Sequence, residues 1–362
     1  MKNTKNPKVM KRTILILAAV LTFSCAWAQS KNEKKAMESF LSQTNTEGVS
    51  NAQTMNLNGT KFTSMAGVKV ENGAITEIDL KGKKLAGTLD LSNFPALKKV
   101  DVSDNRLTSL IVDNCPALVE VNAGRNALKA FSAAKCPSLQ VLKLYRNRLP
   151  EIDLSGVPLL KEFNISSNFL VSLDVANSAN LTTLNVMNNR LEQLVVTDCT
   201  ALRHLYASYN ELQEISLSGL TSLQNLNVSD NKISKLYIQN LPQLYTLLAS
   251  DNHMTGFSIS GCPMLSDLWL PYNSLTSFAV ESCQNLAFVD LQYNNLTTVY
   301  LSNFSLLQRV NVAQNPQLVT LDVSFDSILR FVNVSGDFML TDFRTDASPE
   351  LHQILGTWSN YI

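Results

Sequence analysis

Few side chains in this sequence have the types and spacing that support catalysis. The three histidines are His204, His253 and His352, and none of them stands in a nucleophile motif. The sequence contains no GxSxG, HExxH or glycine-rich phosphate loop, the local patterns that position a nucleophile, a pair of zinc ligands or a phosphate cradle. We therefore expect a protein that is not an enzyme and that carries no cofactor.

Cysteine is the other residue type with metal or redox chemistry. Beyond the N-terminal segment there are five cysteines, all at one position of a regular register: Cys115, Cys136, Cys199, Cys262 and Cys283. The same position elsewhere holds valine, leucine or phenylalanine, which predicts buried core thiols. The odd count argues against a complete disulfide framework, although neighbouring cysteines on adjacent repeats could be bridged. Without a CxxC pair or partnering histidines, we expect no metal site.

The register that contains the cysteines is a repeat of 21 residues. Asparagine recurs at this interval from Asn105 to Asn315, and a leucine precedes each asparagine by eight residues. The unit reads LxxLxLxxNxLxxLxLxx(C/L)Px, as in residues 139–159. A strict period of this length indicates a solenoid of stacked turns, in which neighbouring turns bury each other's apolar faces.

This pattern resembles the leucine-rich-repeat family, specifically the 21-residue nested type found in bacteria and sometimes called Irreko. The resemblance extends over roughly residues 75–343. It implies a mainly β solenoid with parallel strands on a curved face, little helix and flanking caps. It says little about function.

The alternation within the repeat supports the same fold independently. In each LxL triplet the two leucines point inward and the residue between them points outward, as in a short strand. Because LxxLxL occurs twice per unit, we expect a second extended segment on the other side of each turn. The repeated asparagine follows the first strand, where its amide can satisfy the backbone groups of a buried turn, so we interpret it as structural.

The N-terminal residues 1–28 are typical of a secretory signal peptide. A basic segment precedes the apolar run 13–23, and Ala26-Trp27-Ala28 forms a small-x-small cleavage site. The apolar run is shorter than the roughly 20 residues that a membrane-spanning helix needs. We expect an exported protein of the periplasm, the cell surface or the medium, without a transmembrane span after signal removal. Lipid anchoring through Cys25 is the alternative, although Thr22 and Phe23 depart from the usual lipobox.

The remaining chain divides into three segments. Residues 29–74 are expected to form an N-terminal cap, with a helical stretch over 31–44 and a hairpin that opens the array over 67–80. The array itself covers 75–343, with twelve full turns and a partial one. Residues 344–362 are expected to form a C-terminal cap or tail.

The outward positions of the first strand carry the candidate binding residues, because solenoids use such concave faces for recognition. Most of these positions hold asparagine, aspartate or serine, and the exceptions are largely aromatic. Clustered exposed aromatic residues mark binding sites more often than scattered ones. The candidate ligand-binding residues are Tyr206, Tyr209, Leu248, Asp267, Trp269, Tyr272, Phe288, Asp290 and Tyr293.

A basic patch on the same face, nearer the N-terminus, is a second candidate surface. It is formed by Arg125, Lys143 and Arg146, which a solvated surface would also explain. The signal segment holds five basic and no acidic residues, so its removal leaves 25 basic and 30 acidic residues and a net charge of −5. This balance argues against nucleic acid, which requires a strongly basic footprint.

These observations favour a non-enzymatic, extracytoplasmic binding protein that recognises a protein or peptide through the concave strand face. A glycan-binding surface protein is an alternative, since aromatic rings stack on sugars and Asp267, Asp290 and Asn311 could bind hydroxyl groups. A structural or adhesive surface component without a discrete pocket is another. The assignment of function depends on analogy between folds, which is weaker than the assignment of the fold itself.

Overall fold

The computed structural model describes residues 31–57 and 65–356. The expected signal peptide and Cys25 therefore lie outside the described residues, as do residues 357–362 of the expected tail. Within the described ranges, no helix has the combination of length and apolar character that a bilayer crossing requires. The chain divides into two compact units, residues 1–159 and 160–362, and this boundary lies inside the predicted array.

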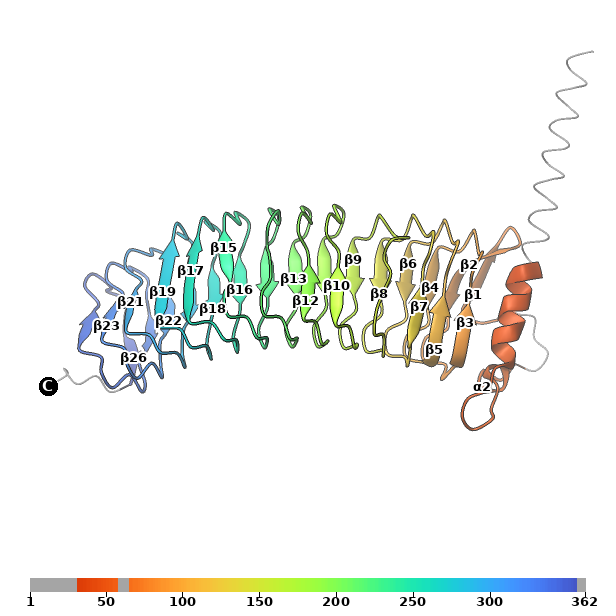
Figure 1. Ribbon diagram of the computed structural model, residues 1–362, viewed down its shortest axis with the longest axis horizontal. Coiled ribbons are helices and arrows are strands. Elements are labelled where there is room, and N and C mark those ends of the chain that lie inside the picture. Colours follow the sequence, from red (N-terminus) through yellow and green to blue (C-terminus); the bar gives the residue numbers. More distant parts are fainter. Residues whose placement is uncertain (1–30, 58–64, 357–362) are drawn as a thin grey trace, which may run out of the picture. The chain divides into compact units, whose positions relative to one another are not determined.

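Unit 1 begins with a helix over residues 31–42 and the short helix α2 (Asn51–Thr54), followed by stacked turns (Figure 1). Ser50 caps α2 by accepting a hydrogen bond from the backbone N–H of Gln53, whose side chain bonds back to Ser50. Strands β1 and β2 pair antiparallel, which confirms the predicted hairpin. The main sheet of this unit consists, in order, of β1 (Val68–Glu71), β2 (Ala74–Asp79), β4 (Lys99–Asp101), β6 (Glu120–Asn122) and β8 (Val141–Lys143).

Unit 2 continues the same construction with ten parallel strands in one sheet. Each residue pairs with the residue at the same position of the next repeat, so Leu205 lies beside Leu226. We call the outward side of this sheet the strand face. Its strands are β9 (Glu162–Asn164), β11 (Thr183–Asn185), β13 (His204–Tyr206), β14 (Asn225–Asn227), β16 (Thr246–Leu248), β18 (Asp267–Trp269), β20 (Phe288–Asp290), β22 (Arg309–Asn311), β24 (Phe331–Asn333) and β26 (Gln353–Leu355).

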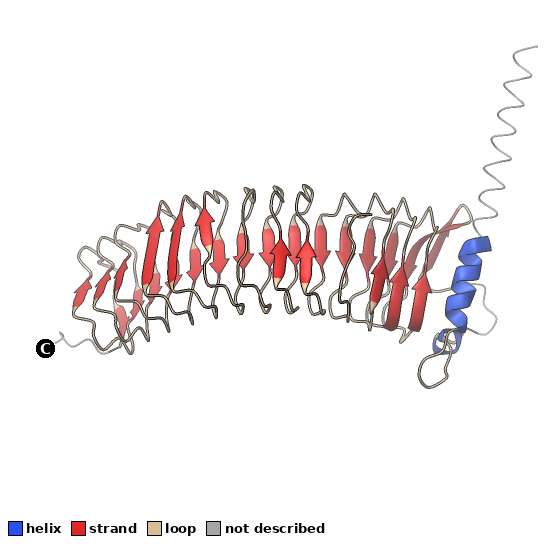
Figure 2. Ribbon diagram, in the orientation of Figure 1, coloured by secondary structure: helices blue, strands red, loops and turns tan. Residues whose placement is uncertain are grey.

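A second set of strands lies on the opposite side of the turns in each unit, as the doubled LxxLxL motif predicts (Figure 2). We call this side the second face. In unit 1 it holds the sheet β3 (Ala86–Asp90), β5 (Arg106–Ile111) and β7 (Ala130–Ser132). In unit 2 it holds three separate sheets, formed by β10 (Ser172–Asp174) and β12 (Gln193–Val195); by β15 (Tyr237–Gln239), β17 (Gly256–Ser260) and β19 (Ser277–Glu281); and by β21 (Thr298–Tyr300), β23 (Thr320–Asp322) and β25 (Asp342–Arg344).

The core lies between the two faces and consists of the repeated apolar positions. Leu142 and Leu144 are fully buried, whereas Lys143 between them is only partly buried, as the alternation of a strand requires. Burial of one such leucine stabilises the fold by about 2 kcal/mol. The five cysteines are free thiols in this core with no exposed surface, which confirms the interpretation of their register position.

The asparagine of each turn binds the backbone of its own turn and of the preceding one. The Nδ2 of Asn231 donates to the carbonyls of Ala207 and Val228, both at 3.0 Å, and its Oδ1 accepts from the backbone N–H of Leu212 at 3.0 Å. Repetition of this arrangement confirms the structural role predicted for the asparagines.

The residue that precedes each asparagine has a left-handed backbone. Tyr209, Tyr272 and Tyr293 have φ values of 57°, 55° and 54°. This conformation costs about 1–2 kcal/mol for a residue with a Cβ atom, and the asparagine bonds offset that cost. The three tyrosine side chains are exposed, so the turn presents them to solvent.

The second face of unit 2 is interrupted twice, between β12 and β15 and between β19 and β21, and at the first interruption one turn lacks the predicted strand. Residues 213–218 follow the alternating pattern but form no strand, and they separate the sheet that ends at β12 from the one that begins at β15. In unit 1, residues 152–154 likewise form no strand. The second extended segment is therefore present in most turns rather than in all of them.

Candidate functional site

A hollow of about 350 Å³ opens on the strand face of unit 2 across β18, β20, β22 and β24. This volume is within the range of small-ligand and side-chain pockets. The strand register explains its composition, because it brings the same repeat positions of four turns together. The hollow is lined by Asp267, Trp269, Phe288, Val289, Asp290, Arg309, Val310, Asn311 and Phe331. We call it the Trp269 hollow.

Three aromatic rings supply the apolar surface of the Trp269 hollow. Trp269 occupies an outward position of its strand and is 41% exposed, and Phe288 and Phe331 are partly buried. The guanidinium of Arg309 lies 5.1 Å from the centre of the Phe331 ring, a cation–π contact. The hollow thus combines aromatic contact area with the exposed charge of Arg309 at its edge.

Carboxylates border the aromatic rings. Asp267 is partly buried, and desolvation raises the pKa of its carboxyl group. Asp290 is only 8% exposed, and burial likewise raises its pKa. Its Oδ2 accepts a hydrogen bond from Asn311 Nδ2 at 3.1 Å, and its Oδ1 accepts one from the backbone N–H of Gln292 at 3.0 Å. Asp267 also has hydrogen-bonding neighbours, Ser266 and Thr246, and it is less deeply buried than Asp290.

A pair of tyrosines extends the aromatic surface beyond the strand ends. The rings of Tyr272 and Tyr293 stack with their centres 4.5 Å apart and their planes 11° apart. Both remain nearly half exposed, at 48% and 44%. Stacked rings that keep this much surface open form an aromatic platform, which we call the Tyr272–Tyr293 platform.

The structure separates the remaining predicted residues into two groups. Leu248 lies on β16 directly beside Trp269 of β18, so it continues the apolar surface by one turn. Tyr206 and Tyr209 lie three turns earlier, and the Tyr206 ring is parallel to that of His204 with centres 6.4 Å apart. They share the strand face with the Trp269 hollow but do not line it.

The predicted basic patch belongs to unit 1. Arg125 forms an ion pair of 3.7 Å with Asp104, and Lys99 on the same sheet pairs with Glu120 at 2.8 Å. Arg146 is exposed, and Lys143 is partly buried and engaged in an interaction of its own. Acidic partners therefore accompany the basic residues of this surface, and such exposed pairs contribute little to stability.

Two outward-facing residues of the hollow, Arg309 and Phe331, were not among the residues predicted from the sequence, and the lining residues Val289 and Val310 belong to the repeated apolar positions. Arg309 and Phe331 both lie at the strand start, the position that also places Asp267 and Phe288 on this face. The extra residue at Asn315-Pro316 moves Phe331 to 22 residues after Arg309, so a strict period of 21 does not reach it. Alignment of the turns by their LxL triplets identifies it.

Among the described residues, no group of three or more histidine, cysteine, aspartate or glutamate side chains is placed to hold a metal ion. The arrangement at the Trp269 hollow provides apolar contact area, two carboxylates and one guanidinium. These groups suit recognition of a side chain.

Comparisons with known proteins agree with the repeat. A family model described as Leucine Rich repeats (2 copies) matches residues 200–243. No curated protein matches the chain. The chain thus contains leucine-rich repeats.

Solved structures show the same fold at low sequence identity. The functional domain of InlJ from Listeria monocytogenes is 22% identical, with a TM-score of 0.51 over 80% of this chain and 73% of that one. The effector YopM from Yersinia pestis is 24% identical, with a TM-score of 0.55 over 77% and 76%. A chain of the LRIM1/APL1C complex is 19% identical, with a TM-score of 0.52 over 71% and 51%. The predicted mainly β, leucine-rich-repeat solenoid with parallel strands is confirmed.

Proposed function

We propose that this protein is a non-enzymatic binding protein that recognises a protein or peptide partner through the strand face of unit 2. The observation that carries the proposal is the Trp269 hollow, which combines exposed aromatic surface with hydrogen-bonding groups at one place on a regular sheet. Buried interface anchors are typically aromatic or arginine side chains surrounded by polar groups.

Three further observations support a protein or peptide partner. Leucine-rich repeats are generally protein-interaction modules, and one structure with this fold is described as a complex, LRIM1/APL1C. The Tyr272–Tyr293 platform enlarges the apolar surface next to the hollow. The carboxylate of Asp267 at the rim favours a basic or amide-bearing group beside the partner's apolar anchor.

The signal-like segment 1–28 supports action outside the cytoplasm, in the periplasm, at the cell surface or in the medium. The nested 21-residue repeat supports a bacterial source. We therefore propose a bacterial protein that is exported from the cytoplasm. Detection of the mature chain beginning at Gln29 in the exported fraction of the native cells tests the export, and retention of an uncleaved chain in the cytosol would contradict it.

Replacement of the anchor tests the site. Peptides selected from a displayed random library on the wild-type protein should carry a large apolar or aromatic residue next to a basic one. Trp269→Ala should weaken their binding at least about tenfold, because the anchor loses its largest contact. Titration calorimetry measures the affinities, and thermal unfolding checks that the partly exposed position leaves the fold intact.

Tyr300→Ala is the matched control, since Tyr300 is an aromatic residue that is 57% exposed on the second face. It should bind the selected peptides as tightly as the wild type. Peptides that bind Trp269→Ala and the wild type equally well would show that the hollow is not the site.

A further inference from the structure

The second face of unit 2 contains a groove where its parallel ladder opens. Between β10 and β12 the ladder is intact, with Val175 N–H donating to the carbonyl of Val195 at 2.9 Å. The equivalent bond one turn later, from Val196 to Ser216, is not formed between these described residues. The next equivalent, from Leu217 to Tyr237, is also not formed.

Both ends of this turn remain attached to their neighbours. Asp198 N–H donates to the carbonyl of Ser218 at 3.1 Å, and Lys232 N–H donates to that of Leu212 at 2.9 Å. The Gln213 carbonyl also accepts from Ser234 N–H at 3.3 Å, so the ladder is open only in the middle, over residues 214–217. Backbone groups there that lack a ladder partner are left for solvent or a ligand to satisfy.

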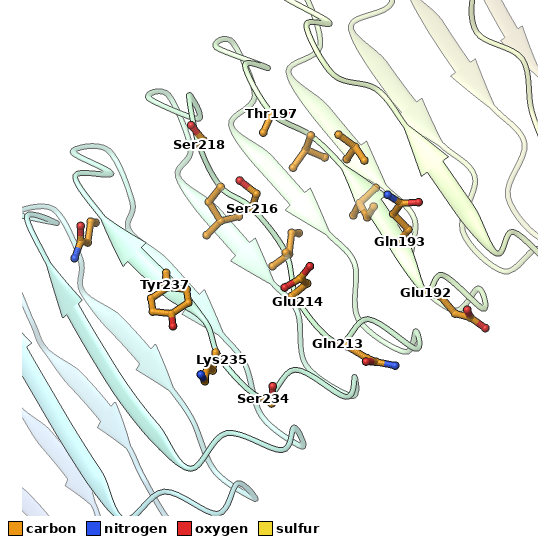
Figure 3. Close-up of a pocket in the computed structure, with 16 residues that line it drawn as sticks. Glu192, Gln193, Thr197, Gln213, Glu214, Ser216, Ser218, Ser234, Lys235 and Tyr237 are labelled. Atoms are coloured by element: carbon orange, nitrogen blue, oxygen red, sulfur yellow. The ribbon is translucent and has the colours of Figure 1, made fainter.

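The open turn forms the floor of a groove of about 900 Å³, which we call the second-face groove (Figure 3). Its outward side chains form three rows across three successive turns. The first row is Gln193, Glu214 and Lys235; the middle row is Val195, Ser216 and Tyr237; the third row is Thr197, Ser218 and Gln239.

The middle row determines the shape of the groove. Val195 and Ser216 are short, so the floor is low, whereas the Tyr237 ring is 74% exposed and stands at the end of the row. Figure 3 shows this ring on the turn next to that of Glu214 and Ser216. An exposed tyrosine combines an apolar ring face with a hydroxyl group at its tip.

The outer rows consist almost entirely of groups that form hydrogen bonds. Amide, carboxylate and ammonium groups lie on one side of the low floor and hydroxyl and amide groups on the other, so both sides offer hydrogen-bond donors and acceptors. A ligand that matches them has to donate and accept at many points and present one apolar face to a ring. Sugar rings have this combination, with hydroxyl groups at the rim and C–H groups on the faces.

The charges of the lining favour a neutral ligand. Glu192 and Glu214 carry two negative charges and Lys235 one positive charge, so a polyanionic glycan would meet a net negative surface. A peptide added as a strand is a poorer match, because residues 213–218 already occupy the place between β12 and β15 that such a strand would take.

We infer that the second-face groove binds a neutral oligosaccharide, with the Tyr237 ring packed against one sugar and the side chains of the outer rows bound to its hydroxyl groups. The groove lies on the second face, and the Trp269 hollow lies on the strand face of the same unit. Binding at the two sites is therefore separable by mutation.

The test titrates four neutral probes, cellohexaose, xylohexaose, mannohexaose and chitohexaose, into the whole chain at up to millimolar concentration, with an anionic hexasaccharide derived from heparin as the comparison. Saturation-transfer NMR detects contact, and titration calorimetry gives affinity. At least one probe should bind the wild type. Tyr237→Ala should weaken that binding at least about tenfold, and Ser216→Trp, which fills the floor, should abolish it.

Tyr300→Ala is again the matched control, because Tyr300 occupies the same repeat position as Tyr237 three turns later, is exposed and lies outside the groove. It should bind the probe normally, and so should Trp269→Ala. Tyr237→Ala should still bind the selected peptides. Failure of the oligosaccharide inference would then leave the proposed peptide-binding function unaffected.

Three results would overturn the inference. The first is that none of the four hexasaccharides contacts the wild-type protein. The second is that a probe binds Tyr237→Ala as well as the wild type. The third is that binding is confined to an anionic hexasaccharide derived from heparin, or is lost in Trp269→Ala rather than in Tyr237→Ala.

Discussion

At the residue scale, the asparagine of each turn has more consequence for stability than its polar character suggests. Asn294 is 3% exposed; its Nδ2 donates to the carbonyls of Leu270 and Leu291 at 3.1 and 2.9 Å, and its Oδ1 accepts from Leu275 N–H at 2.9 Å. Removal of the amide leaves the buried Leu275 N–H without its partner, whereas the carbonyls of Leu270 and Leu291 each keep a second donor, from Asn273 and Asn315. A buried group left without a partner costs about 1–3 kcal/mol.

Asn294→Ala should therefore lower the free energy of unfolding by about 1–3 kcal/mol. The neighbouring Asn295 provides an unusually close control, because it is the same residue type but exposed. Asn295→Ala should change the free energy of unfolding by less than about 0.5 kcal/mol. Denaturant titration followed by circular dichroism measures both, and equal effects of the two substitutions would contradict a structural role for the asparagine series.

Two buried carboxyl groups near the C-terminal end break the pattern of neutral amides and apolar side chains. Asp337 occupies an asparagine position, where its Oδ1 accepts from Asn315 N–H at 2.7 Å, and Asp326 occupies the position that holds cysteine elsewhere. One oxygen of each carboxyl is buried without a hydrogen-bond partner. Burial raises the pKa of each carboxyl to about 7.

A carboxyl group with a raised pKa in the folded state holds its proton more tightly than the unfolded chain does. Its contribution to stability is therefore most favourable below the unfolded value of 3.8 and is lost progressively as the pH rises to about 7. Asp337→Asn removes this loss and should stabilise the C-terminal turns at neutral pH by as much as about 4 kcal/mol.

Hydrogen exchange of the backbone amides in β22 and β24 measures this local stability. In the wild type, protection should fall between pH values of about 4 and about 7, after correction for intrinsic exchange, and the fall should be smaller in Asp337→Asn. Asp346→Asn, at an exposed position of the same unit, serves as control. An identical pH profile in the wild type and in Asp337→Asn would show that Asp337 does not titrate in this range.

At the element scale, most of the fold is predictable because the repeat determines where the strands lie and which of their side chains are buried. Leu142 and Leu144 alternate with Lys143, and this local alternation determines which face of a strand is buried whatever surrounds it. The antiparallel hairpin of β1 and β2 is equally local, since its residues are adjacent in sequence.

The opening of the second-face ladder is not predictable in this way. Ile215 and Leu217 alternate with polar residues just as Phe257 and Ile259 of β17 do, and all four are buried. Whether two turns lie close enough to form hydrogen bonds depends on the packing between them, which one turn's sequence does not contain. The alternation therefore predicts where side chains point but not where a ladder opens.

The candidate site was predictable in part for the same reason. Trp269 and Phe288 stand out against the polar residues of their repeat positions, and the structure brings both into one hollow. Phe331 was missed because the inserted residue near Pro316 breaks the period, and Arg309 because a single charged residue on a solvated face carries no signal. The hollow itself could not be predicted, because its walls come from four adjacent strands, β18, β20, β22 and β24.

At the scale of the whole molecule, unit 2 presents different chemistry on its two faces. The strand face concentrates aromatic rings in and around the Trp269 hollow, whereas the second-face groove is lined mainly by polar groups. Each turn of a solenoid contacts only its neighbours, so substitutions at either surface can be made without loss of the stack. This separation allows each proposal to be tested in the presence of the other site.

The central claim, that Trp269 contacts the partner, is tested most directly by its own fluorescence. The sequence has three tryptophans, Trp27, Trp269 and Trp358, so a chain that begins at Gln29 and carries Trp358→Phe retains Trp269 alone. Saturation with a library-selected peptide that lacks tryptophan should shift its emission to shorter wavelength and reduce quenching by acrylamide, because the 41% exposed ring becomes enclosed. A peptide that saturates the protein while the emission and quenching of Trp269 stay unchanged would contradict the claim.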